Sequence, residues 1–207
     1  AKYYYVKSGK IKGYAWVGFF KTAKTTAKKA ATKPAAPKTS TKTPSSKSKA
    51  NSNGTFSLNV SEYRAAFLSY VNAERAKRGI APLTEDNDMN TLAAYRANQL
   101  PTNFTHFNAD GSMIALGVAK KLNVKSPTSE NINQEYVNGY GWNDGTNSSI
   151  DNSKDVALAD GYSYIYDDAE DNWGHRDSLL NKNYTKIGMG ITYVKGQNLN
   201  YTVNDLY

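Results

Sequence analysis

The uneven distribution of charge along this chain most limits what it can fold into. Residues 1–55 contain thirteen lysines and no acidic residue, whereas residues 56–207 contain thirteen Lys and Arg and all eighteen acidic residues. The two parts therefore carry formal charges of +13 and −5, within a total of +8. Because a lysine-rich stretch repels itself and has little apolar area to bury, it does not fold alone. We expect a basic, flexible head and a mildly acidic folded body.

The head divides into two segments of different composition. Residues 21–55 are almost wholly Lys, Thr, Ala, Ser and Pro, which predicts an extended, disordered linker. Residues 1–20 are rich in Tyr, Val, Trp and Phe and are broken by glycines, a pattern typical of short β-strands joined by tight turns. Such a short β-rich piece buries too little apolar area to be stable alone. It is interpreted as the remnant of a larger β-rich module.

The body, residues 56–207, is long enough for one good core. Apolar residues at helical spacing predict helices at about 61–77, 89–100, 156–168 and 175–180. A further short helix is possible near 113–122. Alternation predicts two strands at the end of the chain, 187–194 and 199–207, joined by a turn. The Gly-, Asn- and Ser-rich stretch 107–155 otherwise shows weak periodicity. Helices first and paired strands last favour an α+β layer fold.

Several functional classes are excluded by composition. The chain has no cysteine, so a disulfide, a Cys-based zinc site and a thiol nucleophile are impossible. It has no stretch of eighteen apolar residues, which argues against a transmembrane segment. It begins at Ala1 without an initiator Met or a signal-peptide pattern, and we interpret it as the processed product of an exported protein. No nucleic-acid-binding module follows the basic head, so a cell-wall polyanion is a better expected partner than DNA.

The two histidines of the chain, His106 and His175, both lie in short polar segments with aromatic residues nearby. Histidine is the commonest side chain for metal binding and for proton transfer near neutral pH. We expect both rings in one cleft, where two imidazoles and a shared carboxylate could hold Zn²⁺ with water completing the shell. A metal-activated water or a carboxylate base could then perform hydrolysis. Alternatively, these groups form a hydrogen-bonded core that only fixes the loops.

Seven short segments together resemble one known family. They are Asn72-Ala-Glu-Arg75, Pro82-Leu83, Ala94-Tyr-Arg96-Ala97, Thr105-His106, Ser129-Glu130-Asn131-Ile132, Gly174-His175-Arg176 and Tyr184-Thr-Lys-Ile187-Gly-Met-Gly190. Their order over roughly residues 60–207 is similar to the bacterial form of the CAP superfamily, also called the SCP domain. That superfamily comprises cysteine-rich secretory proteins, antigen 5 and pathogenesis-related 1 proteins. The resemblance implies a three-layer α-β-α sandwich with a central, mainly antiparallel sheet and a shallow cleft.

In this family the cleft is lined by two histidines and two acids, and the resemblance carries these roles to particular residues. His106, Glu130 and His175 match three of the four positions directly. For the fourth position Asp167 is preferred, with Asp168 as the alternative. His106 and His175 are then the expected metal ligands, and Glu130 and Asp167 the expected catalytic carboxylates if the protein is an enzyme. Arg75 and Arg96, on separate predicted helices, are expected to form buried or interfacial ion pairs.

The N-terminal segment also resembles a known module, the end of a lactobacillus-type surface-layer or wall-attachment domain. The likeness rests on YYYVKSGKIKGYAWVGFFK in residues 1–20. We therefore expect a secreted, cell-wall-associated CAP protein of a Gram-positive bacterium, held to teichoic acid or peptidoglycan through residues 1–55. The alternatives are a metal-dependent hydrolase of envelope peptide or glycan, and a lipid- or sterol-binding protein. The third needs an apolar groove, which the polar stretch 133–153 does not favour.

Overall fold

The computed structural model describes residues 3–8, 11–16, 56–137, 140–143 and 146–207. The chain forms two compact units, residues 1–47 and 48–207, and each is described by itself. In the first, strands β1 (Tyr3–Ser8) and β2 (Ile11–Trp16) pair antiparallel. The predicted linker, residues 21–55, lies outside the described residues. The attachment module and the linker therefore stay predictions.

The described part of the second unit contains five helices. They are α1 (Val60–Ala76), α2 (Asn87–Gln99), α3 (Ile114–Leu122), α4 (Ser153–Tyr166) and α5 (Gly174–Leu179). Three of them, α1, α2 and α4, begin after a polar capping residue. The side chains of Asn59, Asp86 and Asn152 each accept a hydrogen bond from the backbone N–H three residues later. Such N-caps satisfy a backbone donor that has no partner within the helix. All five helices lie close to their predicted positions.

A four-stranded sheet lies at the centre of the second unit. Its strands are β3 (Thr84–Glu85), β7 (Lys186–Val194), β8 (Leu199–Leu206) and β4 (Ser129–Tyr136), in the order β3-β7-β8-β4. The short β3 is parallel to β7, and the other neighbours are antiparallel. A separate hairpin is formed by β5 (Tyr140–Asn143) and β6 (Thr146–Ser149). The two C-terminal strands match the prediction, whereas β3, β4, β5 and β6 were not predicted.

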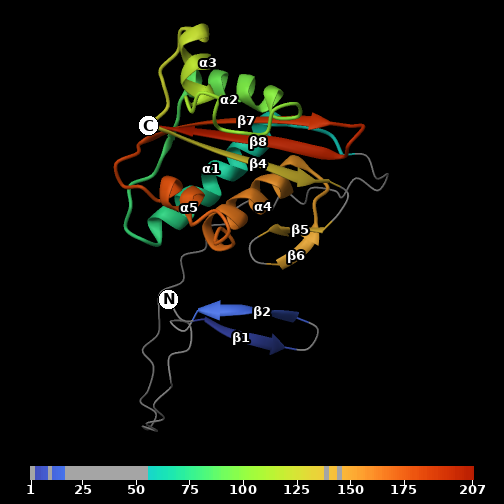
Figure 1. The fold of residues 1–207 in the computed structure, drawn as a ribbon. Coiled ribbons are helices and arrows are strands. Elements are labelled where there is room, and N and C mark those ends of the chain that lie inside the picture. Colours follow the sequence, from blue (N-terminus) through green and yellow to red (C-terminus); the bar gives the residue numbers. More distant parts are fainter. Residues whose placement is uncertain (1–2, 9–10, 17–55, 138–139, 144–145) are drawn as a thin grey trace, which may run out of the picture. The chain divides into compact units, whose positions relative to one another are not determined.

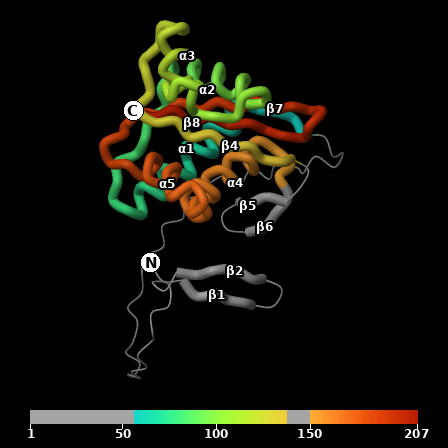
Figure 2. Tube along the Cα trace, in the orientation of Figure 1, coloured from blue at the N-terminus to red at the C-terminus, as the bar shows by residue number. Residues whose placement is uncertain are grey.

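Helices cover both faces of this sheet. Figure 1 shows α2 and α3 on one face and α1, α4 and α5 on the other, and Figure 2 follows the same path of the chain. One core, which includes Tyr63, Phe67 and Ile165, fills the space beside α1 and α4. A smaller core includes Ala93 of α2 and Val203 of β8. The α+β fold and the three-layer α-β-α sandwich are confirmed.

Two glycines let α2 lie directly on β7. A Cβ atom on Gly188 would lie 2.0 Å from the backbone carbon of Met89, and one on Gly190 would lie 2.2 Å from the backbone of Ala93. Backbone atoms cannot move away as the end of a flexible side chain can. The glycines therefore fix the position of α2, which carries Arg96 and leads into the loop that contains His106.

Arg75 corrects one prediction. Its fully buried guanidinium donates no hydrogen bond to an acid in the described structure, so the expected ion pair is wrong. Instead it donates to four backbone carbonyls, those of Ala81, Leu179, Asn181 and Tyr184. Five N–H donors in a rigid plane suit this task. Arg75 thus ties the end of α1 to the segment that follows α5.

No helix in the described part of the chain is both long enough and apolar enough to cross a membrane.

Candidate functional site

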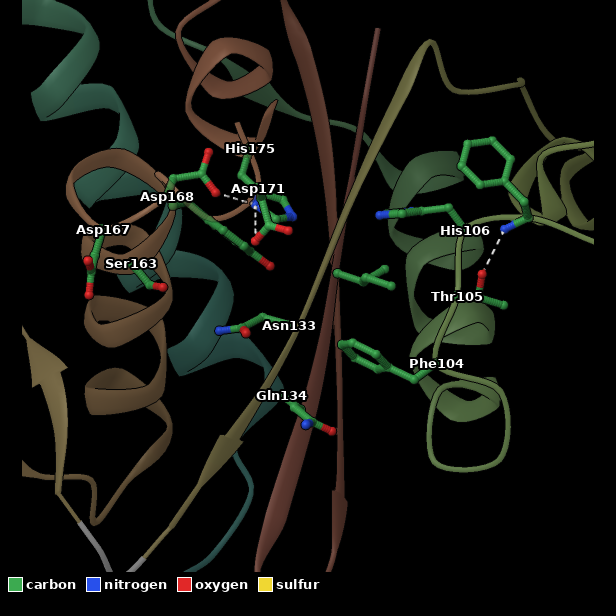
Figure 3. A pocket seen from close by; sticks show the side chains of 13 residues that line it. Phe104, Thr105, His106, Asn133, Gln134, Ser163, Asp167, Asp168, Asp171 and His175 are labelled. Carbon is green, nitrogen blue, oxygen red and sulfur yellow. Dashed lines mark hydrogen bonds and ion pairs between the residues drawn. The ribbon is translucent and has the colours of Figure 1, made fainter. Parts of the chain in front are cut away.

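An open cleft of about 570 Å³ lies beside β4, with the loop after α2 on one side and α4 and α5 on the other. It is lined by Phe104, Thr105, His106, Phe107, Ile132, Asn133, Gln134, Ser163, Tyr164, Asp167, Asp168, Asp171 and His175. Figure 3 shows His106 and His175 pointing into it from opposite sides. The structure thus places both histidines in one cleft, as the sequence predicts.

His106 is held by a buried ion pair behind it. Arg96 donates from Nε to Oε2 of Glu130 at 2.8 Å and from Nη2 to Oε1 at 3.1 Å. Its Nη2 also donates to the carbonyl of Thr105 at 2.9 Å, which anchors the loop. Oε1 of Glu130 lies 3.0 Å from Nδ1 of His106. The predicted ion pair of Arg96 therefore exists, and it orients the imidazole through Glu130.

The charge of Glu130 follows from these donors. Burial raises the pKa of Glu130, but the hydrogen bonds from His106 and Arg96 outweigh burial and leave the pKa below its usual value. Asp205 lies opposite Glu130 in the pairing of β4 with β8. Burial and the negative charge of Glu130 raise the pKa of Asp205 well above its usual value. The pKa values of the two acids are therefore shifted in opposite directions.

His175 is held in a similar way on the other side of the cleft. Its Nδ1 lies 2.6 Å from Oδ1 of Asp168, whose Oδ2 accepts the backbone N–H of Arg176 at 3.1 Å. The chain reaches α5 through Asn172 and Trp173, both with left-handed backbone angles. This turn brings the start of α5 back onto the residues that follow α4. Oδ2 of Asp171 lies farther from the same Nδ1, at 3.8 Å.

The acid that contacts His175 is Asp168, the alternative for the fourth position, rather than Asp167. Both residues line the cleft, but Asp168 is buried and Asp167 is exposed. Helix α4 ends at Tyr166, so the chain direction changes at this pair of acids. Sequence spacing within a helix does not determine which of two adjacent acids turns inward after the helix ends.

A polar network under the cleft was not predicted. Asp160 of α4 is fully buried and accepts hydrogen bonds from Tyr63 Oη at 2.9 Å and from Asn133 Nδ2 at 2.8 Å. Burial raises the pKa of Asp160 to about 6, even though these donors lower it. Next to it, Asn131 accepts from the hydroxyl of Ser178 at 2.8 Å. The network joins β4 to α1, α4 and α5, and no motif in the sequence indicates it.

The two imidazoles do not share a carboxylate, which corrects the expected arrangement. Each has its own acid, Glu130 for His106 and Asp168 for His175. In the described part of the chain, Asp168, Asp171 and His175 form a possible metal-binding cluster. One ligand atom from each of them lies within 4.8 Å of the other two. His106 lies outside this group. The described part of the cleft therefore contains one group of possible metal ligands, the Asp/Asp/His cluster, with His106 across from it (Figure 3).

The chain is similar to a known protein family and to several solved structures. The family model of the CAP, or cysteine-rich secretory protein, family matches residues 68–205. The CAP domain of enterococcal PrgA is 18% identical, with 69% of this chain and 58% of that chain covered and a TM-score of 0.48. An extracellular SCP-domain protein from Bacillus anthracis is 17% identical, with 68% and 39% covered and a TM-score of 0.44. An outer surface protein from Borrelia burgdorferi is 16% identical, with 72% and 94% covered and a TM-score of 0.48.

The chain thus spans less than two thirds of the enterococcal and Bacillus chains that it matches. A comparison with curated proteins found no match. The family match extends from within α1 into β8, one residue short of its end, and includes both histidines and the acids that contact them. This chain therefore belongs to the cysteine-rich secretory protein (CAP) family, although it contains no cysteine.

Proposed function

We propose that this protein is an extracellular CAP protein of the bacterial envelope whose cleft reversibly binds a divalent metal ion, with Zn²⁺ the ion expected. One observation carries the metal site. Both imidazoles point into one cleft, and the Nδ1 atom of each lies within hydrogen-bond distance of a buried carboxylate. His106 and His175 are the proposed ligands.

The paired carboxylates favour metal binding through the other ring nitrogen. When Nδ1–H donates to Glu130 or to Asp168, the lone pair of the same imidazole is on Nε2. Histidine ligands of metals almost always donate their second ring N–H to such an acceptor. Two histidine ligands leave coordination positions for water or for a ligand. A site with two protein ligands and an open cleft suits reversible binding better than a permanent structural metal.

The Asp/Asp/His cluster is the competing ligand set. A metal ion on Asp168, Asp171 and His175 would take carboxylate oxygens away from the imidazole that Asp168 now contacts at 2.6 Å. The two sets share His175; the cluster also contains Asp168 and Asp171, and the pair of histidines also contains His106, so His106 and Asp171 each belong to one set alone. Single substitutions at these two positions therefore separate them.

Calorimetric titration of the full chain with Zn²⁺ tests the proposal. We expect His106→Ala and the double variant His106→Ala/His175→Ala to lose binding, while Asp171→Asn binds as the unchanged protein does. Loss in Asp171→Asn with retention in His106→Ala would assign the metal to the cluster. Undiminished binding by the double variant would refute both sites. Circular dichroism of each variant checks that the fold is intact.

Hydrolysis and lipid binding receive less support from this cleft. Glu130 is engaged by Arg96 and His106, and its pKa is lowered, so it is a poor general base. Hydrolysis would then depend on water activated by a bound metal. The three aspartates and two histidines in the lining do not favour a lipid. Metal binding without turnover is therefore the function that the geometry supports best.

A further inference from the structure

Strand β4 forms both the edge of the central sheet and part of the cleft wall. The strand order ends with β4, and in the described residues β8 is its hydrogen-bonded neighbour. Ile132, Asn133 and Gln134 of β4 line the cleft. Figure 3 shows this strand running between the side that carries His175 and the side that carries His106. A strand edge therefore faces the space between the two histidines.

The pairing pattern shows which backbone groups of β4 face away from β8. The N–H of Val137 donates to the carbonyl of Asn198 at 2.9 Å, which continues the β4–β8 ladder. Backbone groups alternate between the two sides of an antiparallel strand. Even-numbered residues of β4, Ile132 and Gln134 among them, thus direct N–H and C=O away from β8. In the described part of the chain, the backbone N–H and C=O groups of Ile132 and Gln134 form no hydrogen bond outside the sheet.

The β7–β8 ladder gives the same result independently. The N–H of Tyr207 donates to the carbonyl of Lys186, and the N–H of Lys186 donates back to Tyr207. Odd-numbered residues of β8 therefore bond to β7, which leaves its even-numbered residues for β4. Since even residues of β8 lie opposite odd residues of β4, the even residues of β4 face the free edge.

The two sides of the cleft differ in chemistry. On the side of α4 and α5 lie Asp167, Asp168 and Asp171, and the described lining residues include no Lys or Arg. On the other side Phe104 and Phe107 are 45% and 56% exposed. Both side chains belong to the loop that carries His106, and large apolar side chains that are this exposed are suited to contact with a ligand. One side is therefore acidic and the other aromatic.

We propose that the cleft binds an extended peptide segment of another protein by strand addition to the edge of β4. Strand addition takes affinity from main-chain hydrogen bonds and specificity from alternate side chains. Successive side chains of a strand point to opposite faces. A peptide with alternating apolar and basic side chains would place the apolar ones against Phe104 and Phe107 and the basic ones against Asp167 and Asp171. This binding uses the cleft of the metal site but does not rest on a metal.

Fluorescence anisotropy with three peptides tests the mode of binding, using the full chain in EDTA. The first is a labelled peptide of alternating Lys and Val. The second has the same side chains, but every backbone nitrogen is methylated, which removes the hydrogen-bond donors of both strand edges and keeps the charge. The third has Glu in place of Lys. We expect only the first to bind well. Equal binding of the first two would mean attraction by charge alone and would overturn strand addition.

A matched pair of variants tests the edge itself. Gln134→Pro removes the outward N–H but leaves the ladder to β8 intact, as prolines on edge strands do. Gln134→Ala removes the side chain and keeps that N–H. We expect Gln134→Pro to bind the Lys/Val peptide about tenfold more weakly and Gln134→Ala to bind it unchanged. Equal affinities of the two variants would overturn the proposal.

The same variants keep this proposal separate from the metal site. Gln134→Pro should still bind Zn²⁺ in calorimetry, which also reports that its cleft is folded. His106→Ala/His175→Ala should lose Zn²⁺ and keep the peptide. If Gln134→Pro proves unfolded by circular dichroism, the methylated peptide on the unchanged protein decides the question.

Discussion

At the scale of single residues, the surroundings of each buried acid decide its charge. The pKa of Glu130 is lowered because donors from Arg96 and His106 outweigh the cost of burial. Asp160 has donors too, but for this fully buried carboxylate burial wins, and its pKa is about 6. Both acids lie beside the cleft, and only Glu130 accepts from a guanidinium. A cationic donor, rather than hydrogen bonding in general, lowers the pKa of a buried acid here.

The raised pKa of Asp160 predicts a specific pH dependence. Between the usual value of 3.8 and about 6, folded Asp160 keeps a proton that the unfolded chain releases. This residue's contribution to stability is therefore fully present below the lower value and falls as the pH rises to about 6. The Asp160→Asn variant has no titrating carboxyl at this position, so its stability does not fall with pH for this reason. We expect its free energy of unfolding, relative to the unchanged protein, to rise by about 2–3 kcal/mol between pH 3.5 and 7.

Urea denaturation of both proteins at the two pH values measures this change. The comparison across pH cancels any difference in hydrogen bonding to Tyr63 and Asn133 that does not depend on pH. A difference between the proteins that stays constant with pH would show that folding does not shift the pKa of Asp160.

Arg75 offers a second prediction at this scale. Arg75→Lys keeps the positive charge but cannot reach four carbonyls with one ammonium group. Buried carbonyls are left without donors, so we expect a loss of about 2–4 kcal/mol in the free energy of unfolding. Arg78→Lys, in which the partner Glu74 can still be reached, is the control. Chemical denaturation of the two variants should show a large loss only for Arg75→Lys.

At the scale of elements, the contact of α2 with β7 positions one half of the site. Gly188 and Gly190 let the two backbones approach, and Arg96 follows on α2 with Glu130 as its partner on β4. The loop after α2 then carries His106 to the cleft. Any change that lifts α2 from the sheet should therefore disturb His106 before His175, which depends on α4 and α5.

Gly190→Ala tests this dependence. The added methyl group would lie 2.2 Å from the backbone of Ala93, so the helix must move. We expect a loss of about 3 kcal/mol or more in the free energy of unfolding, in line with overpacking of a rigid contact. Gly196→Ala, where the added atom would meet nothing within 4 Å, should change it little. Similar melting temperatures of the two variants would contradict the close contact.

At the scale of the whole molecule, charge separates the two parts of the chain. The body carries a formal charge of −5 and residues 1–55 carry +13. A polyanion of the cell wall would be attracted to the basic part and repelled by the other. The proposed attachment through residues 1–55 follows from this difference and from the resemblance of the first twenty residues to a wall-attachment module.

Retention on isolated Gram-positive cell walls measures this attachment. We expect the full chain to be retained and residues 56–207 to be released, with retention falling as salt is raised because exposed charges are screened. Equal retention of both proteins would contradict attachment through the basic part. Residues 48–207 form a compact unit in the structure, which supports the use of the shorter protein.

Much of the fold could be predicted from local pattern. Helix positions follow from apolar spacing and capping residues, and β7 and β8 follow from alternation. Strand β4 could not be found in this way, because Ile132 is the only aliphatic residue of Ser129–Tyr136. Several of its polar residues, Asn131, Asn133 and Gln134, face the cleft or the buried network. Of the site, the sequence indicated His106, His175 and Glu130 through their motifs. Asp171 and Asp160 are brought there only by packing.

What the sequence alone determined is a charge boundary, a set of helices and strands, and a family whose motifs place two histidines in one cleft. The tertiary structure decided which acid contacts the Nδ1 atom of His175, because the chain turns after α4 and buries Asp168 while Asp167 stays exposed. It also decided that Arg75 binds carbonyls and that the edge of β4 borders the cleft. Local pattern sets which segments form, but contacts between distant segments set which side chains meet.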